Sequence, residues 1–213
     1  MSKKPALILL HRYTNLAATI HMLRSRTITL LNPATWDDRN DAYFMAEYKR
    51  RVQAKTILAL CFAERNESYH HWRIFAPGSD GVRIEFDKKK LLTTFFRDER
   101  VRYSDVIYKQ IEEVRRVKYF QIDSLPFLKR SPFEDEGEFR VVYVDKAEAL
   151  DHKDFEIDVS WIRRITLSPW IPPSLCDSIK KTLQDIKGCS GVKIYRSTLI
   201  ENEKWRDLAS NAG

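Results

Sequence analysis

The stretch that decides the fold class is Glu136-Gly137-Glu138-Phe139-Arg140-Val141-Val142-Tyr143-Val144. Two carboxylates separated by one residue precede an apolar run whose β-branched and aromatic side chains are typical of a buried strand. A glutamate at such a strand start is held rigidly while it faces a cleft, as a catalytic carboxylate requires. The competing interpretation is a solvated strand edge with alternating charges.

Outward from this strand, further apolar runs alternate irregularly with amphipathic ones. We expect strands at residues 6–10, 27–31, 56–62, 82–86, 101–103, 136–144, 161–167 and 192–195. We expect helices at residues 15–26, 42–54, 67–75, 111–122 and 172–186, with Asn15 as the cap of the first and either Asn40 or Asp41 as the cap of the second. The order lacks a regular βαβ rhythm, so the sequence predicts an α+β fold with a curved or split mixed sheet and peripheral helices. A single domain over residues 1–213 fits the length and the absence of linkers or repeats.

The composition of the chain limits the classes of protein to which we expect it to belong. No apolar stretch approaches a membrane span, and the run after Met1-Ser2-Lys3-Lys4 is too short for a signal-peptide core. Three widely spaced cysteines argue against a disulfide framework or a thiolate zinc site and indicate a reducing cytoplasm. The formal charge of +7 suits a polyanionic partner such as nucleic acid, although solubility alone explains it equally well. Basic side chains cluster at Lys49-Arg50-Arg51, Lys88-Lys89-Lys90, Arg115-Arg116 with Lys118, and Lys129-Arg130.

Standard catalytic motifs are absent from the sequence. It contains no phosphate-binding P-loop, no dinucleotide-binding glycine fingerprint and no nucleophile elbow. Asp37, Asp38 and Asp41 have the chemistry to bind Mg²⁺ in a nuclease, but aspartates in such a loop are more often turn formers and helix caps. We therefore expect no metal site, and a metal-dependent nuclease is the third-ranked function.

A resemblance is carried by motifs along nearly the whole chain. The sequence resembles a bacterial family catalogued as a domain of unknown function, and it departs from that family at Ala42, where proline is usual. The motifs that carry the resemblance are His11-x-Tyr13-Thr14, Asn32-Pro33, Asn40-Asp41, Cys61-Phe62, Trp72, Gly81-Val82-Arg83-Ile84-Glu85-Phe86, Glu136-x-Glu138-Phe139-Arg140, Ile165–Pro169 and Val192-Lys193-Ile194.

The layout is also similar to the ADP-ribosyltransferase superfamily, in which a histidine ends the first strand and a glutamate begins a late strand. This similarity implies an ADP-ribosyltransferase-like fold and NAD as co-substrate. It implies that Glu138 stabilises the charge developing at the ribose and that Glu136 orients the acceptor, making these the catalytic candidates.

The NAD-binding candidates follow from the same similarity. His11 and Thr14 would contact ribose or carboxamide, Arg12 and Arg140 the diphosphate, and an aromatic side chain would stack on nicotinamide. That aromatic is left open among Tyr13, Tyr43, Trp72 and Phe75. The function we predict is an NAD-dependent ADP-ribosyltransferase that modifies nucleic acid, as a toxin or phage-defence effector with an antitoxin or inhibitor protein as partner. The main alternative is a noncatalytic module that binds a nucleotide or nucleic acid.

Overall fold

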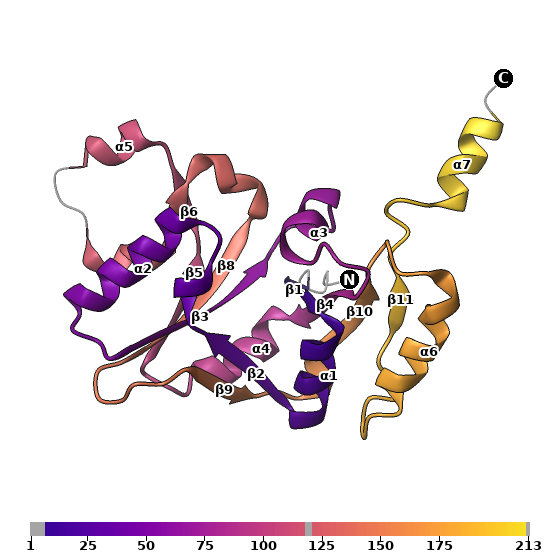
Figure 1. Cartoon of the computed structure of the whole chain (residues 1–213), viewed down its shortest axis with the longest axis horizontal. Helices are drawn as coiled ribbons and strands as arrows, with labels where there is room; N and C mark the ends of the chain where they lie inside the picture. Colours follow the sequence, from indigo (N-terminus) through magenta and orange to yellow (C-terminus); the bar gives the residue numbers. More distant parts are fainter. Residues whose placement is uncertain (1–6, 118–120, 212–213) are drawn as a thin grey trace, which may run out of the picture. The chain divides into compact units, whose positions relative to one another are not determined.

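The computed structural model describes residues 7–117 and 121–211, and Figure 1 draws its strands and helices. The chain divides into two compact units, each assembled from segments distant in the sequence. Unit 1 comprises residues 7–10, 27–65 and 87–157, and unit 2 comprises residues 11–26, 66–86 and 158–211. The single domain over residues 1–213 stays a prediction.

Unit 1 is built on antiparallel strands in the order β9-β2-β3-β8-β5. The longest pairing joins β3 (Thr56–Ala63) to β8 (Glu138–Asp145), with Ala63 opposite Glu138 and Thr56 opposite Asp145. The other three are β2 (Thr27–Leu31), β5 (Val101–Asp105) and β9 (His152–Glu156), and a separate parallel pair is formed by β6 (Ile107–Lys109) and β7 (Leu128–Arg130).

Helix α2 (Arg39–Arg51) covers part of this unit's core. Its inward side chains Met45 and Tyr48 pack with Ile57 and Ala59 of β3 and Val142 of β8. The remaining elements of unit 1 are η1 (Pro33–Thr35), α4 (Lys88–Phe95), α5 (Ile111–Arg115), η2 (Ile122–Phe127) and η3 (Ser131–Glu136).

Unit 2 carries strands in the order β11-β10-β4-β1. Strand β10 (Ile162–Leu167) pairs antiparallel with β4 (Gly81–Asp87) and parallel with β11 (Ile194–Arg196), so the pairing is mixed. Strand β1 (Leu9–Asn15) leads directly into α1 (Leu16–Ser25). The other elements are α3 (Tyr69–Phe75), η4 (Val159–Trp161), α6 (Pro173–Gln184) and α7 (Glu203–Ser210). The predicted α+β class with a mixed sheet and peripheral helices is confirmed.

Helix boundaries test the capping predictions. The Asn15 side chain accepts a hydrogen bond from the Ala18 amide, as expected of the first cap. Helix α2 instead begins three residues earlier than predicted, because Asp38 accepts from the amides of Asn40 and Asp41 and is therefore its cap. The predicted helix 111–122 is wrong in length: α5 ends at Arg115, and residues 118–120, with the cluster residue Lys118, lie outside the described part.

Strand boundaries differ at both candidate sites. Residues His11 to Thr14 lie within β1 and not after it, while Ala6 and the Met1–Lys4 segment lie outside the described residues. Strand β8 starts at Glu138; Glu136 ends η3, and Gly137 between them has a left-handed φ of 51°. The regular strand expected through both glutamates is therefore wrong. Within the described residues, no helix is long and apolar enough to cross a membrane.

Candidate functional site

Five charged side chains of unit 1 form a buried group that we call the carboxylate–cation cluster. Its members come from α2, β7, η3 and β8: Asp41, Lys129, Glu136, Glu138 and Arg140. Glu138 is 6% exposed and Arg140 is fully buried. Burying a charge without a partner costs roughly several kcal/mol, so each member needs a partner of opposite charge. Lys129 pairs with Glu136, and Arg140 pairs with both Asp41 and Glu138.

Arg140 is the centre of the carboxylate–cation cluster. Its Nε and Nη2 donate to the two carboxylate oxygens of Glu138 at 2.7 and 2.9 Å, and its Nη1 and Nη2 donate to Asp41 at 2.9 and 2.7 Å. A further bond from Nη1 reaches the carbonyl oxygen of Pro126 at 2.8 Å. A guanidinium has five N–H donors, and these five bonds use all of them. Arg140 therefore orients two carboxylates, and this geometry argues against a contact with the NAD diphosphate.

Lys129 joins the two glutamates that flank Gly137. Its Nζ lies 2.5 Å from Glu136 Oε2 and 3.5 Å from Glu138 Oε2. The left-handed turn at Gly137 thus lets both carboxylates approach one ammonium although only Glu138 belongs to the strand. The backbone amide of Glu138 donates to the hydroxyl of Tyr108 at 2.9 Å, which fixes the start of β8 further.

The two glutamates have opposite electrostatic environments. Burial alone would raise the pKa of Glu138, but the charge and hydrogen bonds of Arg140 outweigh it and hold that pKa at about 2. Burial raises the pKa of Glu136 above its ordinary value despite the ion pair with Lys129. Glu138 is therefore a fixed negative charge at neutral pH, whereas Glu136 binds a proton more readily than a free glutamate. Two neighbouring carboxylates with divergent pKa values suit a division into stabiliser and proton acceptor.

A second group, which we call the histidine–arginine cluster, lies in unit 2 on β1, β4 and β10: His11, Arg83 and Glu85, which are buried, and Arg164, whose side chain is 45% exposed. Arg83 donates to Glu85 at 2.6 Å, and Arg164 donates to the same oxygen at 2.5 Å. The Nη2 of Arg83 lies 3.0 Å from Nδ1 and 3.4 Å from Nε2 of His11. Since a guanidinium only donates, we assign the nearer nitrogen, Nδ1, as the acceptor and place the ring proton on Nε2.

His11 is neutral at physiological pH. Burial first, and then the charge of Arg83, lowers its pKa from 6.5 to about 4. Its Nε2–H is therefore a hydrogen-bond donor without a charge, a suitable partner for a hydroxyl group.

The aromatic side chains considered for the nicotinamide contact differ in how deeply they are buried. Trp72 is fully buried, and its indole N–H donates to Glu67 at 2.7 Å. The Tyr13 ring packs edge-to-face with the Trp72 ring at a centroid distance of 5.2 Å and stacks on the His71 ring at 5.5 Å. Trp72 thus supports Tyr13 from inside unit 2. Phe75 is 39% exposed and is the most accessible ring among Tyr13, His71, Trp72 and Phe75.

The remaining predicted residues lie at half-buried or exposed positions outside the two clusters. Arg12 and Thr14 are both half-buried in β1, and Tyr43 is exposed on α2. The predicted site residues thus fall into two sets: Glu136, Glu138 and Arg140 belong to unit 1, and His11, Arg12, Tyr13, Thr14 and Trp72 belong to unit 2.

The aspartates proposed for a nuclease are used in other ways. Asp38 caps α2 and Asp41 pairs with Arg140, while Asp37 is exposed. Among residues 7–117 and 121–211, no group of three or more His, Cys, Asp or Glu side chains is arranged to hold a metal ion. The geometry offers the nuclease interpretation no support.

Sequence reasoning did not identify Lys129, Asp41, Arg83 and Glu85 as partners in these clusters. A usable signal exists, because Arg83-Ile84-Glu85 and Glu138-Phe139-Arg140 each place opposite charges two residues apart in an otherwise apolar strand. Residues at that spacing point to the same face of a strand. Such a pair in a buried strand indicates an internal ion pair, whose distant partners only the fold reveals.

Comparisons with known proteins give limited information. No protein-family model matches the sequence, and no curated protein matches it either. Among solved structures, Thermus sp. 2.9 DarT in complex with carba-NAD⁺ is 11% identical, with a TM-score of 0.47 over 91% of this chain and 97% of that chain. The same protein with NAD⁺ is 10% identical (TM-score 0.46, 92% and 98% covered), and with ADP-ribosylated ssDNA it is 12% identical (TM-score 0.47, 92% and 97% covered). At this level the similarity assigns neither a fold family nor an activity to the chain.

Proposed function

We propose that the chain is an NAD-dependent ADP-ribosyltransferase with an ADP-ribosyltransferase-like fold, in which Glu138 is the catalytic carboxylate. The observation that carries this proposal is the state of Glu138: a carboxylate at the first residue of a buried strand, held ionised and oriented by Arg140 and Lys129. A preorganised negative charge of this kind stabilises a positive charge that appears only in the transition state.

The reaction requires such a charge. When the bond between nicotinamide and ribose breaks, the bonding electrons leave with nicotinamide and the ribose becomes an oxocarbenium ion. Glu138 stabilises that cation, and Glu136 accepts the proton of the attacking acceptor, a role for which its raised pKa is suited. The new bond forms between the acceptor atom and C1 of the ribose.

The residues of unit 2 supply hydrogen bonds and apolar contact. The neutral His11 donates from Nε2 to a ribose hydroxyl, and Thr14 contacts the carboxamide or sugar. Tyr13, supported by Trp72, contributes the aromatic face. Because Arg140 has no free donor, Arg12 is the remaining arginine for the diphosphate.

The acceptor and biological setting extend the proposal. The formal charge of +7 favours a nucleic-acid acceptor. Modification of nucleic acid by a cytoplasmic bacterial enzyme would be toxic to the cell or to an infecting phage, and such a toxin requires an antitoxin or inhibitor protein. Each of these statements depends on the transferase activity.

The test uses NAD labelled in its adenylate half, incubated separately with DNA, RNA and protein. Wild type is expected to transfer label to one acceptor and to release nicotinamide, whereas Glu138→Gln does neither. Glu136→Gln is the matched variant, since it makes the same change of charge in the same cluster. It is expected to release nicotinamide but to lose most transfer. Full transfer by Glu138→Gln with an intact fold would overturn the assignment.

A second candidate function has one specific observation in its favour. Both oxygens of Glu138 are bonded to Arg140 and the side chain is only 6% exposed, as in a purely structural ion pair. Under this interpretation the protein is a noncatalytic module that binds a nucleotide or nucleic acid. It predicts ligand binding without nicotinamide release, and it predicts that Glu138→Gln changes stability but not affinity.

A further inference from the structure

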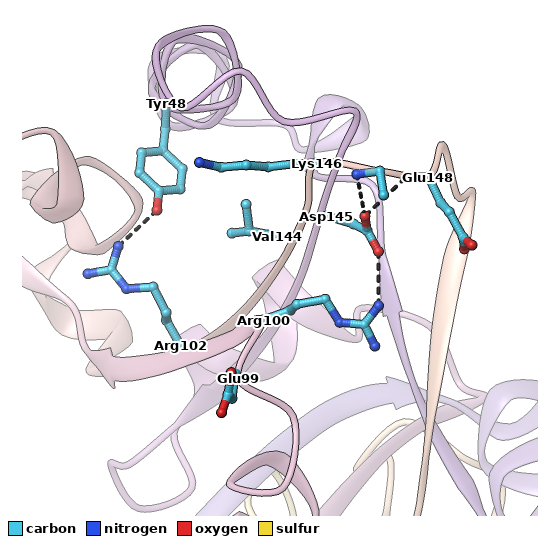
Figure 2. Close-up of a pocket in the computed structure, with 9 residues that line it drawn as sticks. Tyr48, Glu99, Arg100, Arg102, Val144, Asp145, Lys146 and Glu148 are labelled. Atoms are coloured by element: carbon cyan, nitrogen blue, oxygen red, sulfur yellow. Dashed lines mark hydrogen bonds and ion pairs between the residues drawn. The ribbon is translucent and has the colours of Figure 1, made fainter.

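A pocket of about 480 Å³ lies in unit 1, away from the carboxylate–cation cluster. Its walls come from the last turn of α2, the start of β5 and the turn after β8, as Figure 2 shows. Strand β8 begins at Glu138 and ends at Asp145 beside this pocket. Seven strand steps of about 3.3 Å place the two ends roughly 23 Å apart. The pocket is therefore a separate site from Glu138.

Three of the lining side chains are cations, Arg100, Arg102 and Lys146, and three are carboxylates, Glu99, Asp145 and Glu148. Lys146 is exposed, and no ion pair or hydrogen bond engages its ammonium within the described residues. In Figure 2 its side chain extends toward Tyr48 and Arg102. The Arg102 side chain is 37% exposed, donates to the Tyr48 hydroxyl at 2.8 Å and pairs with Asp123 at 2.9 Å, and these contacts fix its guanidinium at the wall. Arg100 is the third cation of the lining, and it pairs with Asp98 at 2.8 Å and with Asp145 at 3.0 Å.

Carboxylates pair with the two arginines and leave Lys146 as the lining cation without a partner among the described residues. Asp145 accepts from Arg100, from Tyr143 and from the amides of Ala147 and Glu148, so its oxygens are occupied. In Figure 2 the Glu148 side chain points away from Lys146, and Glu99 is drawn apart from Lys146, below Arg100. What remains for a ligand is the unpaired ammonium of Lys146 beside the remaining N–H groups of Arg102, and these donors suit a phosphate oxygen.

Further cations adjoin the pocket. Lys49 follows Tyr48 in the last turn of α2, and the Lys55 amide donates to the Asp145 carbonyl oxygen at 2.8 Å. Both lysine side chains are exposed. Exposed lysines on several segments beside one pocket fit a polyanion better than a single small anion.

From these observations we propose that the pocket binds a backbone phosphate of a single-stranded nucleic acid. The separation of roughly 23 Å from Glu138 falls within the reach of a strand that occupies a site of about 4–16 nucleotides. The proposal rests on the proposed function in one respect, the identification of this strand as the acceptor for ADP-ribose. Binding itself requires no turnover.

The test measures binding of fluorescent single-stranded 20-mers of DNA and RNA by anisotropy, between 50 and 200 mM salt and without NAD. Lys146→Ala is expected to weaken binding about 5-fold at low salt and to reduce the magnitude of the salt slope by about 0.7, the loss of one phosphate contact. Lys89→Ala is the matched control, because Lys89 is an exposed lysine of unit 1 outside the pocket. It is expected to leave the salt slope unchanged.

Three results would overturn the proposal. The first is equal behaviour of the Lys146→Ala and Lys89→Ala variants. The second is absence of binding by the folded wild type. The third is calorimetric binding of inorganic phosphate that Lys146→Ala abolishes while oligonucleotide affinity stays the same, which would make the pocket a free-phosphate site. Because no arm contains NAD, failure of the transferase proposal gives a different pattern: oligonucleotide binding that depends on Lys146, with no label transferred.

Discussion

Glu138 links the charge of one buried carboxylate to the stability of unit 1. Its pKa is lowered from 4.5 to about 2 in the folded chain, so the folded state binds its proton less readily than the unfolded state. The stabilisation is complete above pH 4.5 and is lost as the pH falls toward 2. It amounts to roughly 3 kcal/mol.

We therefore expect Glu138→Gln to lower the free energy of unfolding at pH 7 and to differ progressively less from wild type below pH 4.5. Urea unfolding between pH 3 and 7 measures this difference. Glu156→Gln, an exposed glutamate on β9, is the control and is expected to follow wild type at every pH. A Glu138→Gln deficit that persists unchanged at pH 3 would mean that packing, not charge, accounts for it.

His11 makes stability depend on pH in a higher range. Its pKa falls from 6.5 to about 4 on folding, because burial and Arg83 disfavour the imidazolium. The stabilisation is present above pH 6.5 and is lost as the pH falls through 6.5 toward 4, because the unfolded chain takes up the proton first. His11→Gln is expected to remove this slope between pH 4 and 6.5. His21→Gln, an exposed histidine on α1, is expected to retain it.

At the scale of elements, the turn that joins η3 to β8 sets the positions of both glutamates. Gly137 has a φ of 51°, and a Cβ there would lie 2.6 Å from the Arg65 side chain. Gly137→Ala is expected to cost about 1–2 kcal/mol of stability, because an L-residue is strained in this region. It should also lower transferase activity by displacing Glu136 from Lys129. Gly191→Ala, where an added Cβ meets nothing within 4 Å, is the matched control. Equal melting temperatures for the two variants would contradict this account.

The same turn shows where sequence reasoning reaches its limit. The apolar run after Glu138 correctly predicted a buried strand, because side-chain type reports burial directly. The spacing of Glu136 and Glu138 predicted one regular strand, but a glycine between them takes a conformation open to few other residues. Arg140 was expected to contact diphosphate, and only its distant partner Asp41, 99 positions away, shows that its donors are used internally.

For the whole molecule, element types were predictable and long-range assembly was not. Local patterns placed most strands and helices within a few residues, but they missed the helices α4 and α7 and the strands β6, β7 and β9. The division into two units interleaves three segments of each, an arrangement that no local pattern encodes. It also separates His11 from Glu138 by unit, so the roles proposed for them need a test of ligand binding by the intact chain.

Stabilisation by NAD provides that test, because a ligand that binds only the folded state raises its stability in proportion to the logarithm of ligand concentration. At 100 times the dissociation constant the gain is about 2.7 kcal/mol, which for a chain of 213 residues raises the melting temperature by about 5–10 °C. Glu138→Gln is the protein of choice, since it does not consume NAD, and it is expected to show this rise.

His11→Ala in the Glu138→Gln background is expected to need higher NAD concentrations for the same rise, since it removes a donor to ribose. Lys146→Ala in that background should need no more NAD than Glu138→Gln alone, because its pocket is distinct from the NAD contacts. A melting temperature unchanged at 10 mM NAD, for a protein that still unfolds cooperatively, would contradict NAD as the co-substrate and leave nucleic-acid binding as the remaining function of the chain.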